Sequence, residues 1–349
     1  MKIEIGNKFI GDKYSCFIIA EAGVNHNGDI KLAKRLIDVA KSAGVDAVKF
    51  QTFKSEELVT ETAHMADYQE KNIKGKESQL RMLKKLELNY ADFTKLKEYC
   101  DKKDIIFLST PHTENAVDFL ESLVPAYKIA SGDLTNLPFL EKIAEKEKPI
   151  ILSTGMGKMS EVREAIITIN KKTKGCKIML LHCTTNYPCP LSEVNLRAMN
   201  TLKKEFKDLV VGYSDHTEGV LVSLMAVALG AKVLEKHFTL DKNMCGPDHK
   251  ASLNPQELKD MVDKIRIMEI ALGSEVKEPT ISEKKISKIA RKSIVAKVDI
   301  PEGKKISESM LIIKRPGTGI QPRYFKKIIG MQAKKEIKKD SLIDFKDLK

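Results

Sequence analysis

The sequence predicts a (β/α)8 barrel of the TIM type, followed by a small, mainly β domain. Eight short apolar runs recur along the first 240 residues, and segments with helical periodicity separate them. Continuous runs of Val, Ile and Leu that alternate with amphipathic helices are typical of a parallel sheet covered on both faces. Eight such units fill a (β/α)8 barrel, whose catalytic groups lie at the carboxyl ends of the strands. Nearly every run here ends in polar residues, so these residues are the first candidates for a site.

The eight predicted strands leave room for at least one helix between most neighbours. In chain order they span residues 17–21, 47–51, 105–110, 126–131, 150–154, 178–184, 209–216 and 232–237. They close in motifs such as S-T, L-S-T, S-D-H and E-K-H. Because the carboxyl ends of parallel strands meet at one edge of a barrel, we expect these polar groups to share one mouth.

The chain length fits one barrel plus a smaller domain. With 349 residues and 42% hydrophobic content, it holds a barrel of about 250 residues and a real core. We assign residues 1–275 to the barrel, 276–290 to a charged, proline-containing linker and 291–349 to the second domain. This tail is rich in β-branched residues, and D-I-P-E-G-K-K-I-S-E-S-M-L from Asp299 resembles E-I-K-K-D-S-L-I-D-F-K-D-L from Glu336. Each copy predicts a strand, a turn and a single helical turn.

Composition excludes several classes of protein. The six cysteines form no C-x-x-C pair, and neither a secretory signal nor an apolar run that would span a bilayer is present. These features predict a reduced, cytoplasmic protein without membrane association. The net charge of +12 comes from lysine interleaved with glutamate, and tryptophan is absent. This pattern is typical of a solvated surface rather than a nucleic-acid interface.

Two histidines predict a metal site. His216 ends S-D-H and His237 ends E-K-H, at the ends of two successive strands. A single histidine at a strand end is usually satisfied by the core or by water. Two on neighbouring strands, each preceded by a carboxylate, favour a divalent metal with positions left open to water and substrate.

Two lysines inside apolar strands predict an anion site. An unpaired ammonium at Lys49 or Lys128 would be costly to bury, so each must face an anion, either a structural carboxylate or a bound phosphate. The hydroxyl turns at 109–110, 131–132 and 153–155 offer free N–H groups at neighbouring strand ends. Together, these features favour a phosphorylated acid as substrate.

The remaining polar groups fit a base and a sugar. Glu21 closes the first strand and is a candidate general base beside the metal. Asn25 or Asn27, in the loop that follows, can instead serve as a helix cap. Four further residues suit a polyhydroxylated ligand, namely Gln51, Asn186, Tyr187 and Asp248.

These motifs resemble the sialic acid synthases, nearly end to end. The residues that carry the resemblance are E-A-G-V-N-H-N-G, K-F-Q-T-F, S-T-P, K-I-A-S-G-D, L-S-T-G-M, H-C-T-T-N-Y-P, G-Y-S-D-H-T, E-K-H-F-T-L and G-P-D-H-K-A-S-L. The segments V-A-K-V-D-I-P-E-G and K-R-P-G-T-G are similar to the antifreeze-like, or SAF, domain that these synthases carry.

The resemblance implies a metal-dependent condensation of phosphoenolpyruvate with an open-chain N-acetylated hexosamine and water, with release of phosphate. It places Glu21 in the catalytic role, with Asp133 at the position where many relatives carry glutamate. His216 and His237 would bind the metal, most often Mn2+, with Mg2+ or Co2+ as alternatives. Phosphoenolpyruvate would be held by Lys49, Thr110, Lys128, Ser131, Ser153 and Ser214. Gln51, Tyr187 and Asp248 would contact the sugar, and Arg315 would reach it from the tail of a second chain in a domain-swapped homodimer.

The identity of the sugar stays open at this point. Asp133, His112, Phe50 and Phe53 depart from residues common in relatives, and we expect all four on the sugar side. N-acetylmannosamine, giving N-acetylneuraminate, is the first choice. The second is 2,4-diacetamido-2,4,6-trideoxymannose, giving N,N'-diacetyllegionaminate, and pseudaminate synthesis is a more distant third. A metal-dependent pyruvate aldolase and a non-enzymatic carbohydrate-binding protein are the rival classes, and the two buried lysines favour phosphoenolpyruvate over pyruvate.

Overall fold

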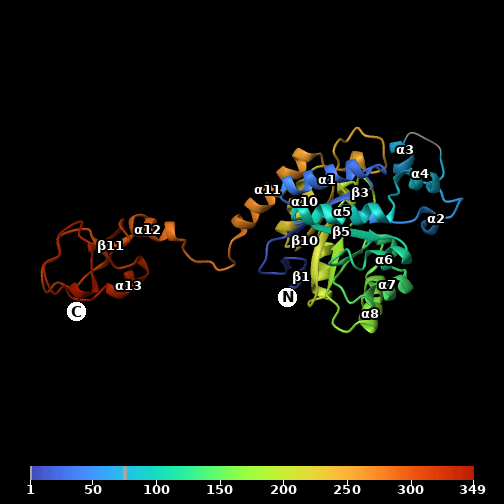
Figure 1. Ribbon diagram of the computed structural model, residues 1–349. Coiled ribbons are helices and arrows are strands. Elements are labelled where there is room, and N and C mark those ends of the chain that lie inside the picture. Colours follow the sequence, from blue (N-terminus) through green and yellow to red (C-terminus); the bar gives the residue numbers. More distant parts are fainter. Residues whose placement is uncertain (1, 74–76) are drawn as a thin grey trace. The chain divides into compact units, whose positions relative to one another are not determined.

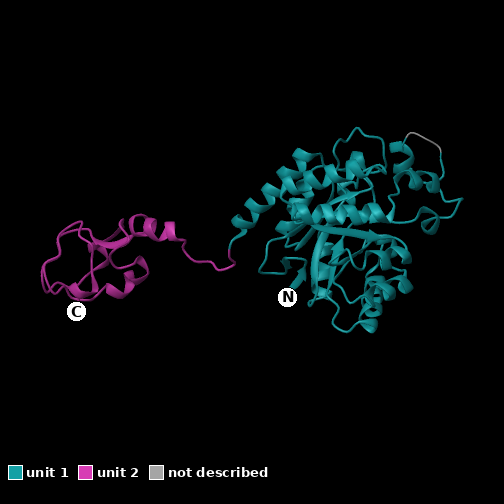
Figure 2. Ribbon diagram, in the orientation of Figure 1, with its two compact units in different colours: residues 1–273 teal, residues 274–349 magenta. Residues whose placement is uncertain are grey.

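The chain forms two compact units that divide after Gly273 (Figure 2). This computed structural model describes residues 2–73 and 77–349. The first unit holds the barrel, and the second unit, from Ser274 to Lys349, holds the tail.

The first unit is a barrel of eight parallel strands, as the sequence predicts (Figure 1). The strands are β3 (Phe17–Gly23), β4 (Ala47–Thr52), β5 (Ile106–Pro111), β6 (Tyr127–Ile129), β7 (Ile150–Ser153), β8 (Ile178–His182), β9 (Val210–Asp215) and β10 (Val233–His237). They pair in the order β5-β4-β3-β10-β9-β8-β7-β6. The two end strands, β5 and β6, lie side by side, so the barrel is nearly closed.

Strand alternation decides which side chains enter the barrel. Successive strand residues point to opposite faces of a sheet. Ile19 and Val233 belong to a small inner core cluster, so the next residues in phase, Glu21 and Glu235, also face the lumen. His237 continues that phase at the end of β10. The lower lumen is therefore apolar, and the layer above it is charged.

Helices cover the outside of the barrel and bury the outward-facing strand residues against a large second core. They are α1 (Ile30–Ala43), α5 (Tyr90–Lys103), α6 (Glu114–Leu120), α7 (Leu137–Ala144), α8 (Met159–Lys172), α9 (Ala198–Glu205), α10 (Leu221–Ala228) and α11 (Pro255–Leu272). Local chemistry sets their ends. The Asp29 side chain accepts the Lys31 N–H at the start of α1, and Gly44, at φ 82°, ends that helix in the left-handed region.

A β-hairpin at the N-terminus was not predicted from the sequence. Strands β1 (Ile3–Ile5) and β2 (Lys8–Ile10) pair in antiparallel fashion. Their residues Ile3, Ile5 and Ile10 are fully buried in the inner cluster, beside the first residues of the barrel strands. The hairpin therefore covers the amino-terminal end of the lumen and leaves the carboxyl-terminal end as the mouth. Strands of three residues are too short for periodicity to reveal.

A long connection follows β4 at the mouth. We call residues 53–73 and 77–89 the β4–α5 segment, which contains α2 (Ser55–Leu58), α3 (Asp67–Ile73) and α4 (Gln79–Leu86). Its own small core contains Phe53, Met65, Met82 and Leu86, packed against Val24 from the loop after β3. This cluster fixes the segment to the barrel at its catalytic end.

The second unit begins with α12 (Ile281–Ala290), within the stretch that the sequence suggested as a linker. Thr280 and Glu283 form its capping box, a signal that was present in the sequence. The unit continues with β11 (Ser293–Ala296), β12 (Leu311–Lys314) and α13 (Phe325–Ile328). Each copy of the internal repeat ends in a single 3-10 turn, at 308–310 and 345–347, and Ile300 pairs with Ile337 across the two copies. Among the described residues, no helix has both the length and the apolar character needed to cross a membrane.

Candidate active site

A cavity of about 120 Å3 lies at the carboxyl-terminal mouth of the barrel. It is lined by Glu21, Lys49, Gln51, Thr110, His112, Lys128, Ala130, Ser131, Gly132, Ser153, Thr185, Tyr187, Ser214, His216, Glu235 and His237. A larger cavity of about 640 Å3 lies beside Lys8 and Asp46 at the other end, where these two charges pair with each other at 3.4 Å. The smaller cavity is lined by most of the charged, imidazole and hydroxyl side chains that the sequence singled out, so it is the candidate site.

Lys49 is bound on two sides in this cavity. Its Nζ lies 2.6 Å from a carboxylate oxygen of Glu21 and donates a hydrogen bond to the Thr110 hydroxyl at 2.9 Å. Only 2% of each charged side chain is exposed. The sequence predicted that this lysine faces either a structural carboxylate or a bound phosphate. The structure supplies the carboxylate, which already neutralises Lys49.

Lys128 has the weaker ionic partner. Its Nζ donates to the Ser153 hydroxyl at 2.8 Å, but the nearest carboxylate oxygen, on Glu235, is 3.5 Å away. Burial lowers the pKa of Lys128, with the charge of Glu235 opposing this effect. A buried ammonium with one distant counter-ion gains more from an incoming anion than a tightly paired one.

Glu235 is the residue that the sequence reasoning missed. It lies between the two lysines, 3.5 Å from Lys128 and 3.7 Å from Lys49, and it accepts a hydrogen bond from Ser214 at 3.0 Å. The signal was present in E-K-H, because alternation puts Glu235 and His237 on the same face of β10. The carboxylate that precedes His216 in S-D-H, Asp215, faces outward and binds Lys236 at 3.0 Å.

The two carboxylates differ in acidity. Burial raises the pKa of Glu21 to about 7, partly offset by Lys49 and reinforced by the charge of Glu235. Burial acts in the same direction on Glu235, but Lys128 and Lys49 outweigh it and lower that pKa to about 2. The two lysines cannot fully neutralise the negative charges of both carboxylates. Glu21, with the higher pKa, is therefore the one able to exchange a proton near neutral pH.

Small groups form a cradle next to Lys128. The Ser131 hydroxyl accepts the Gly155 N–H at 3.1 Å and lies 3.1 Å from the Cys183 sulfur. A Cβ at Gly155 would come within 2.7 Å of the Ser131 hydroxyl and 2.9 Å of that sulfur. Only glycine leaves the backbone this close to the hydroxyls, as a phosphate-binding turn requires.

The two histidines have the properties of metal ligands. The Nδ1 of His216 donates to the Thr184 carbonyl at 2.7 Å, so the neutral ring keeps its lone pair on Nε2, which faces the cavity. Burial lowers the pKa of His216 to about 4 and that of His237 well below its usual value. The ring centroids are 5.6 Å apart, and the buried Nδ1 of His237 makes no hydrogen bond. Two neutral, converging imidazoles fit a divalent cation.

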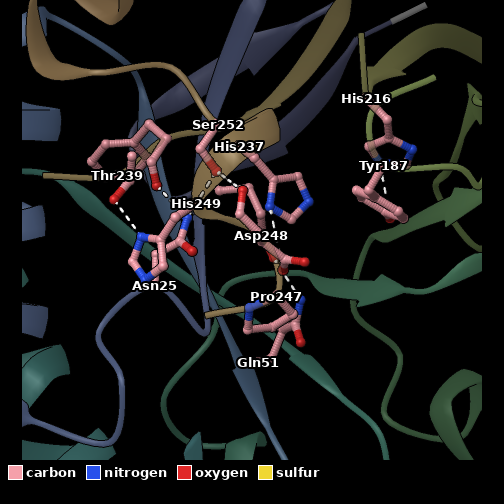
Figure 3. Close-up of polar contacts among 12 residues, drawn as sticks. Asn25, Gln51, Tyr187, His216, His237, Thr239, Pro247, Asp248, His249 and Ser252 are labelled. Atoms are coloured by element: carbon pink, nitrogen blue, oxygen red, sulfur yellow. Dashed lines mark hydrogen bonds and ion pairs between the residues drawn. The ribbon is translucent and has the colours of Figure 1, made fainter. Parts of the chain in front are cut away.

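The loop side of the site faces these imidazoles. Tyr187 stacks on His216 with centroids 4.2 Å apart, and its hydroxyl lies 3.2 Å from Nε2. Asp248 approaches His237 Nδ1 at 3.8 Å, and burial raises the pKa of Asp248 to about 6. Gln51 donates to Glu21 at 3.2 Å. In Figure 3 the His237 ring is directed toward Asp248, and Tyr187 lies against His216.

Not every predicted residue joins this group. Asp133 is half-buried and accepts a hydrogen bond from Asn136, and the described cavity lining includes Gly132 but not Asp133. Asn186 is exposed. Arg315 lies exposed in the second unit. Its role remains a prediction, as do the roles of the other site residues.

The other three departures from the family pattern lie in different parts of the barrel. Phe50 is fully buried in the outer core and stacks on Phe107. Phe53 belongs to the small core of the β4–α5 segment. His112 lines the cavity with its pKa lowered to about 3 by burial and by the charges of Lys49 and Lys128, so it borders the lysines. The expectation that all three contact the sugar is not supported by these positions.

Residues 36–277 match the NeuB family, and residues 291–349 match the SAF domain. The chain belongs to the NeuB family. It is 52% identical over 328 residues to the N,N'-diacetyllegionaminic acid synthase of Campylobacter jejuni, covering 93% of this chain and 98% of that one. It is 49% identical over 329 residues to the enzyme of the same name from Legionella pneumophila, covering 93% and 92%.

A solved structure gives the same answer for the fold. The N-acetylneuraminic acid synthetase of Leptospira borgpetersenii, in complex with citrate, superposes with a TM-score of 0.73 at 36% identity, covering 82% of this chain and 95% of that one. The predicted family, its SAF domain and its enzyme class are thus confirmed. This NeuB-family chain is an enzyme, a synthase of the sialic and legionaminic acid type.

Proposed function

We propose that this NeuB-family enzyme condenses phosphoenolpyruvate with 2,4-diacetamido-2,4,6-trideoxymannose and water, giving N,N'-diacetyllegionaminate and phosphate. One observation carries the choice of sugar. Identity is 52% and 49% to two diacetyllegionaminic acid synthases, but 36% to the sialic acid synthetase of known structure. The first choice from the sequence alone, N-acetylmannosamine, is therefore the less supported one.

The anion side of the cavity supports the use of phosphoenolpyruvate. Lys128, Ser153 and Ser131 offer a cation and two hydroxyls within one cradle, and Lys49 with Thr110 offers a second. A substrate with one phosphate and one carboxylate matches two such positions. These groups stabilise the negative charge of phosphate as it leaves.

The reaction forms one carbon–carbon bond and breaks one carbon–oxygen bond. C3 of phosphoenolpyruvate bonds to C1 of the open-chain sugar while the aldehyde oxygen takes up a proton. Water then adds at C2, and the bond from C2 to the phosphate oxygen breaks as the new C2 hydroxyl becomes the ketone. Of the two protons that water loses, one replaces the proton taken up by the aldehyde oxygen and the other leaves with phosphate. Glu21, at the edge of the cavity between Lys49 and Gln51, is placed to take a proton that this water loses. Lys49 holds the Glu21 carboxylate in position.

We also propose that His216 and His237 hold the divalent metal, with Mn2+ the first choice. When bound, such a cation supplies Lewis-acid polarisation of the sugar aldehyde. Among the described residues, no cluster of three or more His, Cys, Asp or Glu side chains surrounds a possible metal position, so water and substrate would complete the ligand set. His237→Ala should abolish Mn2+ binding, measured by the paramagnetic broadening of water protons, and with it activity. A variant that binds and works as before would refute this site.

The test of the function is a comparison of two sugars. Phosphate release from phosphoenolpyruvate with Mn2+ is measured for 2,4-diacetamido-2,4,6-trideoxymannose and for N-acetylmannosamine at matched concentrations. We expect at least a tenfold higher kcat/KM for the first. A preference for N-acetylmannosamine would instead make the protein an N-acetylneuraminate synthase. Reversible cleavage without phosphate release would make it a pyruvate aldolase.

Arg315 is proposed to act in a second chain, through a domain-swapped homodimer in the cytoplasm. All six cysteines are free, which suits a reducing compartment. Arg315→Ala and Glu21→Gln should each be inactive alone. After the two are mixed and allowed to exchange subunits, donation across chains restores up to about a quarter of the activity, because half the dimers are mixed and each has one complete site. An absence of recovery, with exchange verified by mass, would show that Arg315 serves its own chain or none.

A further inference from the structure

An aromatic residue of the β4–α5 segment contacts Tyr187 of the cavity lining, although nothing in the motifs pointed to it. Tyr68, in α3, lies against Tyr187 with ring centroids 5.2 Å apart and planes tilted by 34°. Tyr187 in turn stacks on His216 at 4.2 Å. Tyr68 is therefore one ring further from the imidazole pair than Tyr187, on the loop side of the cavity.

Two contacts hold this part of α3 at the mouth. The Asn72 amide donates to the Pro247 carbonyl at 2.6 Å, which joins α3 to the loop that carries Asp248. Met65, three residues before Tyr68, is buried in the small core of the segment. Burial, followed by the charge of Asp248, raises the pKa of both Tyr68 and Tyr187. The charge of Asp248, which the sequence already assigned to the sugar, therefore acts on both tyrosines.

The two candidate sugars share their reacting end and differ at the other. Both carry an N-acetyl group next to the aldehyde. At C4, one has a hydroxyl and the other an acetamido group, and at C6 one has a hydroxymethyl and the other a methyl. With C1 beside the imidazoles and lysines, the carbons that differ must extend away from them, toward the loops where Tyr68 lies.

We propose that Tyr68 is the residue that selects the diacetamido-trideoxy sugar, with its ring against the C6 methyl and its hydroxyl donating to the C4 acetamido carbonyl. A methyl group gains from contact with an aromatic face, whereas a hydroxyl desolvated there without a partner loses free energy. The hydroxyl is free to donate, because Gln69 donates to its oxygen at 3.4 Å and leaves its proton available. This inference rests on the proposed function.

Two variants separate the roles of the ring and the hydroxyl. Tyr68→Ala should lower kcat/KM for the diacetamido sugar about 30-fold or more, mostly through KM, and change that for N-acetylmannosamine less than about threefold. Tyr68→Phe, which keeps the ring, should lower it about fivefold. The KM for phosphoenolpyruvate should stay constant in both, because the lysines lie on the other side of the cavity.

Tyr14→Ala is the matched control. Tyr14 is also half-buried and contacts one aromatic ring, Phe9, at 5.6 Å, but it precedes the amino-terminal end of β3. It should leave both sugars unaffected. Saturation-transfer NMR gives a direct readout, in which the C6 methyl receives saturation from aromatic protons in the wild type and in Tyr68→Phe, and loses most of it in Tyr68→Ala.

Three outcomes would overturn the assignment, and none is the failure of the proposed function itself. That failure would appear in the wild type, as a preference for N-acetylmannosamine. The assignment of Tyr68 fails if the wild type prefers the diacetamido sugar and Tyr68→Ala keeps the same ratio. It also fails if kcat falls equally for both sugars, or if the methyl signal persists, since each result would mean that Tyr68 only supports Tyr187.

Discussion

The two sides of the active-site mouth are built in different ways. On the side proposed for phosphate, which we call the strand side, Lys49, Lys128 and Ser153 project from the barrel strands, and each is at least 96% buried. On the side proposed for the sugar, which we call the loop side, Tyr187, Asp248 and Tyr68 come from three separate connections, after β8, β10 and β4, and are tied together by ring contacts and single hydrogen bonds. The rigid strands hold the charged groups in place, while loops can change to fit another sugar.

Removal of the proposed acid/base group, Glu21, should lower activity the most and leave both sides of the mouth intact. Glu21→Gln keeps the size and most contacts of the side chain but cannot take up a proton. We expect kcat to fall about 10³-fold, typical for loss of a general base, with the binding of both substrates retained. Phosphate release and isothermal titration measure the two quantities. Near-normal turnover would remove Glu21 from the mechanism.

Glu235→Gln tests how the lysines that project from the strands are neutralised, without changing the loops. It leaves Lys128 without its nearest carboxylate, and breaking a buried pair costs about 3 to 5 kcal/mol of stability. We expect a lower Tm without ligand and a larger Tm increase on addition of inorganic phosphate than in the wild type, because the anion replaces the lost charge. The exposed pair Lys259 and Asp263 on α11 supplies the control, Asp263→Asn. Equal phosphate-induced shifts in Glu235→Gln and wild type would contradict the role given to Glu235.

Acid should destabilise the barrel through its buried histidines, and His26 tests one that does not line the cavity. His26 is 1% exposed in the loop after β3, and burial lowers its pKa from 6.5 to about 4. The unfolded chain therefore binds the proton more readily, so stability falls as the pH drops from about 7 to about 5, by about 2 kcal/mol for this residue. His26→Gln should flatten that part of the pH profile of Tm, whereas an unchanged slope would show that His26 is not the group responsible.

Loss of one hydroxyl on the loop side should give the smallest effect. Tyr187→Phe removes the group 3.2 Å from His216 Nε2 and keeps the three ring contacts, with Tyr68, His216 and His237. We expect the sugar KM to rise about fivefold, the value for one hydrogen bond, with the KM for phosphoenolpyruvate unchanged. Steady-state kinetics with each substrate varied in turn gives both values. A change in the phosphoenolpyruvate KM would show that the two sides are not independent.

The sequence by itself determined the barrel and the inner ring of its mouth. Apolar runs identified the eight strands, and period-2 alternation is a local property, so Glu21, Lys49 and Lys128 can be placed in the lumen without any knowledge of the tertiary contacts. The same rule would have identified Glu235. The motifs also identified the family, because many of them occur in the same order.

Only the tertiary structure decided what those residues meet. No local pattern shows that Lys49 is closely paired with Glu21 while Lys128 has only the more distant Glu235. These partners are 28 and 107 residues away along the chain. The hairpin that covers the lower lumen and the contact between Tyr68 and Tyr187 also join distant segments. Such contacts depend on how loops pack over the barrel, and packing is set by the whole fold rather than by the period of any one segment.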